Sequence, residues 1–110
     1  VAFEMETPNS TCLTLRHTAK LSPHWEQYGP GATGVGWELG LLGLAIHLVN
    51  PEADKIDEDA FATSTEGKAF SRGSSARWGD AAISAGAPPE KARHSAEQTA
   101  AFYTGESGAT

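Results

Sequence analysis

Residues 28–48 read YGPGATGVGWELGLLGLAIHL, and this stretch decides the fold because it joins turn-forming glycines to the pattern of an apolar helix. We predict a helix over residues 32–50, with four large side chains spaced so that they share one face. These are Trp37, Leu41, Leu44 and Leu48. A neighbouring stripe holds Gly36, Gly40 and Gly43. Each mid-helix glycine costs about 0.5–1 kcal/mol relative to alanine, so the stripe indicates close approach of a sheet or a ligand.

The N-terminal segment has the alternation of a β-hairpin. Apolar and polar side chains alternate in residues 1–6 and again in residues 11–18, and the intervening Thr-Pro-Asn-Ser has the chemistry of a turn. A two-stranded hairpin is marginal in water, so its apolar face needs a helix or further strands. We therefore expect an α+β fold in which the glycine-rich helix packs on the hairpin.

The C-terminal half is predicted to be helical. Residues 51–59 are acidic, and they suit a solvated linker or a helix start, because they lack the alternating ligands and central glycine of a calcium loop. A short helix should follow, then a weak join at residues 71–75 and a helix over residues 75–85, with Gly86 as its cap. Proline and glutamate in the first turn predict a last helix over residues 88–103.

Composition excludes several classes of protein. The 110 residues include 8 Lys and Arg against 14 Asp and Glu, and the formal charge of -6 argues against a nucleic-acid partner. Cys12 is the single cysteine, so an internal disulfide and a multi-cysteine zinc site are excluded. The longest apolar run, residues 39–49, is shorter than the roughly 20 residues of a membrane span, and no secretory leader opens the sequence. We expect a cytoplasmic protein with no membrane span.

Two motifs match catalytic or cofactor patterns without their context. Residues 29–34 match G-x-G-x-x-G, with Asp54 at the distance of a dinucleotide fingerprint, but the segment before them is polar and Pro51 directly follows the helix. Ser84 lies in a degenerate nucleophile-elbow motif, but near a helix end and with no preceding strand. We predict no nucleotide cofactor, and a surface or capping role for this serine.

Titratable residues on the glycine-rich helix are the weak catalytic candidates. Glu38 and His47 could each present a polar group to a cavity and act as acid or base. Nine positions correspond to about 900° of helix rotation, so the two side chains should lie on opposite faces rather than act as a pair. The four histidines are widely separated, and we predict no metal site.

Aromatic and aliphatic residues around the helix entrance are the candidate ligand-binding set. They are Trp25, Tyr28, Trp37, Leu41 and Leu44. Pockets for small molecules are mostly apolar with few polar groups, which this set would provide. Packing in the core is the alternative role for the same side chains.

Six segments of the sequence resemble the C-terminal half of an SRPBCC (START-like) domain, most closely in the bacterial group related to the activator of the heat-shock-protein ATPase. The segments are VAFEME (residues 1–6), TCLTLRHT (11–18), WEQYGPG (25–31), GVGWELGLLGL (34–44), WGDAAISAG (78–86) and TAAFYTG (99–105). The last two resemble an extension found in bacterial members.

The resemblance implies a helix-grip fold, in which a long helix closes over a curved antiparallel sheet and an apolar ligand occupies the cavity between them. Residues 1–50 would supply the hairpin and long helix, and residues 51–110 the acidic linker and helical extension. Members of the family normally begin with a strand, two short helices and several more strands, which this sequence lacks. We therefore expect a partial fold, completed by a second copy in a homodimer or higher homo-oligomer.

Three functions follow as expectations. The first is binding of a hydrophobic small molecule between sheet and helix. The second is an enzyme of the hydrolase or cyclase type, because relatives of this fold include both and use a few polar groups in the cavity. The third is a protein-interaction module, by analogy with the chaperone-activating relatives.

Overall fold

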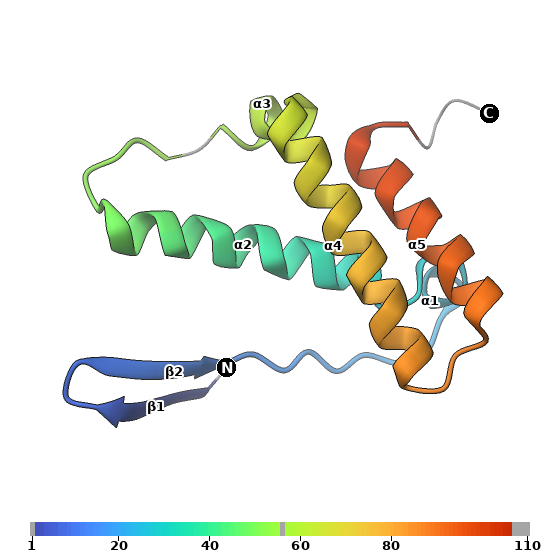
Figure 1. Cartoon of the computed structure of the whole chain (residues 1–110), viewed down its shortest axis with the longest axis horizontal. Coiled ribbons are helices and arrows are strands. Elements are labelled where there is room, and N and C mark those ends of the chain that lie inside the picture. The colour runs from blue at the N-terminus through green and yellow to red at the C-terminus, as the bar shows by residue number, and fades with distance from the viewer. Residues whose placement is uncertain (1, 56, 107–110) are drawn as a thin grey trace.

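The chain folds as a β-hairpin joined to an assembly of helices, and this confirms the predicted α+β class (Figure 1). The computed structural model describes residues 2–55 and 57–106. Its elements in chain order are β1 (Ala2–Thr7), β2 (Ser10–Thr14), α1 (Pro23–Tyr28), α2 (Gly31–Val49), α3 (Glu58–Thr63), α4 (Thr65–Ser84) and α5 (Pro89–Thr104).

The hairpin forms in the predicted place and stays separate from the helices. β1 and β2 are antiparallel, with Phe3 opposite Leu13, and the second strand ends at Thr14 rather than continuing to residue 18. Every residue of β1 is exposed, including Phe3 at 71% and Met5 at 77%. The prediction that α2 packs on the hairpin is therefore wrong for this chain. Figure 1 shows the hairpin lying apart from the helices at the end of an extended segment.

The helical assembly is held together by small residues where helices approach one another. α4 lies along α5, and α2 crosses α4 (Figure 1). A Cβ atom placed on Gly34 would lie 2.1 Å from Cε2 of Trp78, so only glycine lets this indole lie against the backbone of α2. A Cβ atom on Gly79 would lie 2.9 Å from the Cβ of Ala96, which is the equivalent close approach of α4 to α5.

α4 is continuous through the join that the sequence predicted. Ser71, Ser74 and Ser75 are buried in its middle, and the Ser75 hydroxyl donates to the Ser71 carbonyl at 2.6 Å. A serine that bonds back to its own helix needs no other polar partner, so it can occupy a tight helix interface. The predicted stop after α5 is confirmed, since Gly105 has the left-handed conformation with φ 79°.

α2 is buried at its beginning and exposed over most of its length. Ala32 and Val35 are 9% and 0% exposed, and they pack where α2 meets α4 and α5. The predicted face is left uncovered: Trp37, Leu41, Leu44 and Leu48 are 42%, 39%, 39% and 70% exposed. That face was expected to pack on the hairpin, which lies apart from it, whereas α4 borders it at Leu41.

The length of α2 bears on whether this helix could span a membrane. The helix begins at Gly31 and has 19 residues, so the apolar run of residues 39–49 underestimated it. By length and composition α2 is able to cross a membrane. The core helix of a soluble protein meets the same two conditions, so this finding carries no assignment.

Candidate functional site

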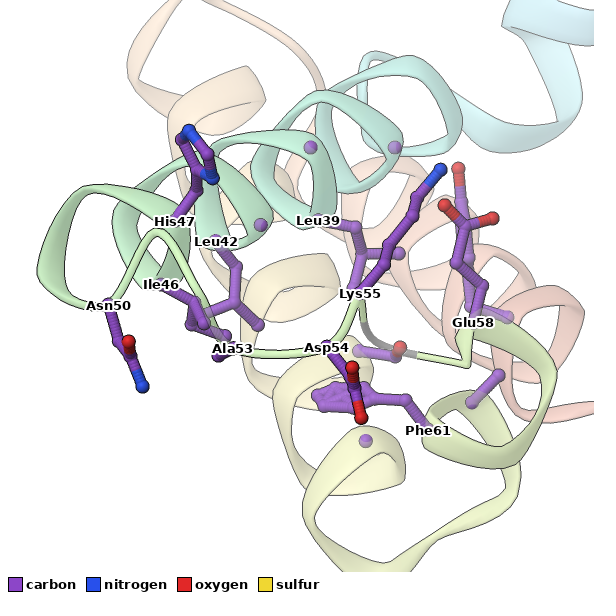
Figure 2. Close-up of a pocket in the computed structure, with 17 residues that line it drawn as sticks. Leu39, Leu42, Ile46, His47, Asn50, Ala53, Asp54, Lys55, Glu58 and Phe61 are labelled. Atoms are coloured by element: carbon purple, nitrogen blue, oxygen red, sulfur yellow. The ribbon is translucent and has the colours of Figure 1, made fainter.

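A cavity of about 680 Å³ lies between α2 and α4 (Figure 2). It is bounded by the segment that follows α2, by α3, and by Tyr103 of α5, and we call it the α2–α4 cavity. Its apolar lining consists of Leu39, Leu42, Ile46, Ala53, Phe61 and Ala62. Sites for drug-sized molecules have volumes of roughly 300–1,000 Å³ and are mostly apolar, so the cavity has the size and lining of a ligand site.

The glycine stripe of α2 lines this cavity. A Cβ atom added at Gly40 or Gly43 would meet no atom within 4 Å, and one added at Gly36 would come within 3.1 Å of the Tyr103 hydroxyl. No close approach of protein atoms therefore explains Gly40 and Gly43 among the described residues. What their missing side chains provide is open volume beside the helix backbone.

Two hydroxyl groups belong to the lining. Ser71 on α4 is 2% exposed and lines the cavity. The Tyr103 hydroxyl donates to the backbone carbonyl of Ala32. Burial raises the pKa of Tyr103 above its ordinary value of 10.0, and the backbone of Gly36 lowers it by a smaller amount. α4 and α5 thus each contribute one hydroxyl-bearing residue to the lining.

Charged and polar side chains lie at the open side of the cavity. Asp54 and Lys55 come from the segment after α2, and Glu58 from the first turn of α3 (Figure 2). All three are exposed, and neither of the ion pairs found in the described residues includes them. The end of α2 adds His47 and Asn50 to the lining.

The predicted ligand-binding residues are not brought together. Trp25 and Tyr28 line a second cavity of about 230 Å³ between α1, α4 and α5. Leu41 lines a third, more open cavity beside α4, whereas Trp37 and Leu44 line none of these three. The Trp37 indole donates instead to Nδ1 of His17 at 3.0 Å.

The two weak catalytic candidates lie on different sides of α2, as their spacing predicted. Glu38 accepts a hydrogen bond from the Ser74 hydroxyl and lines the third cavity, whereas His47 lines the α2–α4 cavity. They therefore do not form an acid–base pair in this structure. In the part of the chain that the structure describes, no three His, Cys, Asp or Glu side chains are grouped to hold a metal ion.

Sequence reasoning missed the side chains that line the α2–α4 cavity on α2. Leu39, Leu42 and Ile46 are spaced by three and four residues, beside the glycine stripe. Such spacing marks a shared helix face, as it did for the larger side chains that were chosen. Phe61 and Ser71 carry no comparable signal, because their place at the cavity depends on how α3 and α4 fold back over α2.

No protein-family model, curated protein or solved structure matches the chain.

Proposed function

We propose that the protein binds a hydrophobic small molecule in the α2–α4 cavity. The observation that carries this proposal is the open glycine stripe: Gly40 and Gly43 line a cavity of about 680 Å³, and a Cβ atom added at either would meet no atom of the described residues within 4 Å. Glycines in mid-helix weaken the helix, so an apolar ligand lying against its backbone is a physical reason for their presence. The resemblance to START-like domains supports the same class of ligand, although here the cavity lies between helices.

The test is native mass spectrometry of protein purified gently from its expression host. We expect additional mass from a small molecule on the wild-type chain, and loss of that mass in Gly43→Leu, whose side chain would fill the cavity. Gly73→Leu is the matched control, because Gly73 is also a mid-helix glycine with nothing within 4 Å but lies outside this cavity. Wild-type protein without added mass, or equal loss in both variants, would contradict the proposal.

We also propose that the chain associates with a second copy of itself. One observation favours this: the hairpin and α2 both expose large apolar side chains, including Phe3, Met5 and Leu48. A two-stranded hairpin is marginal alone in water, and its open edges can pair with those of another hairpin. Sedimentation velocity at increasing concentration should show a dimer or larger species, whereas a monomer over the whole range would refute this proposal.

A further inference from the structure

The chain exposes more surface than a compact protein of its mass. Its solvent-accessible surface is 8146 Å², whereas a folded monomer of 11.5 kDa should expose about 5,800 Å². The radius of gyration of 15.7 Å also exceeds the roughly 13 Å of a compact domain of this length. The excess of about 2,300 Å² is larger than the roughly 800 Å² that each partner buries in a standard protein–protein interface. The chain therefore has enough surplus surface for a stable dimer.

The hairpin contributes an apolar face to this surplus. Phe3 lies opposite Leu13, and directly opposed residues of antiparallel strands have their side chains on the same face. Met5 is on that face too, whereas Glu4 lies between them on the other face, because successive side chains of a strand alternate. Phe3 and Met5 are exposed, and Leu13 is half-buried. The hairpin is therefore apolar on one side and acidic on the other.

α2 contributes a second apolar face of similar length. Its exposed side chains run from Trp37 to Leu48, a distance of about 16 Å along the helix axis. The six residues of β1 span about 20 Å, so one hairpin can cover this face. α4 borders the face at Leu41, whereas Leu44 and Leu48 lie farther along α2 and line none of the three cavities.

The segment between hairpin and helices keeps the two apolar faces of one chain apart. Residues 15–22 form neither helix nor strand, and His17 within them accepts the hydrogen bond from the Trp37 indole. Beyond this contact the hairpin lies away from α2 (Figure 1). The hairpin of a second copy can therefore reach α2 without displacing anything. Pairing between the edges of two hairpins would add backbone hydrogen bonds but would leave both apolar faces in water.

We propose that two copies of the chain exchange hairpins, so that Phe3 and Met5 of each copy lie on the face of α2 that carries Leu44 and Leu48 in the other copy. The inference rests on the proposed self-association and adds which surfaces meet. Exchange of an identical element is a low-cost route to a dimer, and it forms two equal contacts related by a two-fold axis. Glu4, on the other side of the hairpin, stays in solvent.

Complementation between two variants tests the exchange. Phe3→Ser/Met5→Ser damages the hairpin surface and Leu44→Ser/Leu48→Ser damages the helix surface, so each variant alone can form only dimers with two damaged contacts. A mixed dimer has one contact in which both surfaces are wild type. In sedimentation velocity, each variant alone should associate at least about tenfold more weakly than wild type. An equal mixture should form dimers at a concentration at which each variant alone is monomeric.

The matched control is Leu21→Ser/Phe102→Ser. It also removes two large exposed apolar side chains, but from outside both surfaces. Its dimer dissociation constant should stay within about twofold of wild type, because side chains outside an interface contribute little to its affinity. Circular dichroism checks that all variants are folded, and native mass spectrometry of the mixture should show dimers that contain one chain of each variant.

The outcomes separate this inference from the proposed self-association. If wild type associates but the mixture is no more dimeric than either variant, like surfaces meet, so the exchange is overturned and self-association stands. Impairment by only one of the two variants would overturn the exchange as well. A wild-type monomer at every concentration would overturn both, and flotation of that monomer with phosphatidylcholine vesicles would identify a lipid surface as the partner of these side chains.

Discussion

Replacing two glycines of α2 by alanine should stabilise the protein. Gly40→Ala/Gly43→Ala introduces two methyl groups that meet no atom of residues 2–55 and 57–106 within 4 Å, so no steric penalty is expected. Alanine is favoured over glycine in a helix interior by about 0.5–1 kcal/mol per residue, mainly because glycine loses more backbone entropy. The free energy of unfolding should therefore rise by about 1–2 kcal/mol.

Thermal unfolding followed by circular dichroism measures this change. For a domain of about this size, 1 kcal/mol shifts Tm by roughly 4–8 °C, so the double variant should unfold about 4–16 °C above wild type. Urea titration gives the free energy directly, and an unchanged slope would show that both proteins unfold to the same extent.

The matched control is Gly34→Ala on the same helix. Its methyl group would lie 2.1 Å from Cε2 of Trp78, so the indole must move. Overpacking of this kind costs about 1–3 kcal/mol, which exceeds the gain in helix propensity. We expect Gly34→Ala to unfold below wild type. If the double variant at Gly40 and Gly43 lost stability as well, protein atoms would have to fill the space beside those glycines in solution, and the reasoning about an open cavity would be refuted.

Three further predictions address other parts of the molecule. Burial raises the pKa of Tyr103 above 10.0, so the contribution of its neutral phenol to the free energy of unfolding is full below about pH 10 and is lost as the pH rises through the raised pKa. Urea unfolding at about pH 8 and about pH 11 should show a loss of unfolding free energy in wild type that is smaller in Tyr103→Phe. Equal losses in the two proteins would contradict this. Ser74→Ala removes the donor to Glu38 and should lower the free energy of unfolding by about 1–2 kcal/mol in urea, whereas no change would show that water replaces the hydroxyl. Phe3→Ser/Met5→Ser should change the unfolding free energy of the monomer by less than about 0.5 kcal/mol while weakening self-association in sedimentation, and a large loss of monomer stability would show that the hairpin packs on the helices.

Local signals in the sequence predicted most of the element types. The alternation around Phe3 predicted the hairpin, and proline and glycine marked both ends of α5. The continuity of α4 could not be predicted in the same way, because Ser71 and Ser75 are weak helix formers in isolation. They are helical because small side chains allow α4 to pack closely against its neighbours, and sequence propensity contains no information about that packing.

The sequence drew attention to the glycine stripe, whereas the side chains beside it that line the α2–α4 cavity were not among the predicted ligand-binding residues. The reason lies in α2 itself, which is apolar around most of its circumference. In a helix with one apolar face, the sequence shows which face is buried. When a helix is apolar all round, the buried face depends on how the rest of the chain packs. The sequence favoured the face with the largest side chains, Trp37 and Leu41, whereas the structure sets the cavity beside Leu39 and Leu42.

Apolar surface on both sides of α2 is therefore only partly buried by the described residues. The side with Gly40 and Gly43 borders the α2–α4 cavity, which a ligand would fill, and the side with Leu44 is exposed to solvent, where a second copy would bury it. The two proposals thus explain different faces of one helix, and native mass spectrometry separates them. A ligand adds a small mass to each chain, whereas association multiplies the 11.5 kDa mass of the chain itself. If Gly43→Leu removed the small mass and left the multiple intact, the two faces would be shown to act independently.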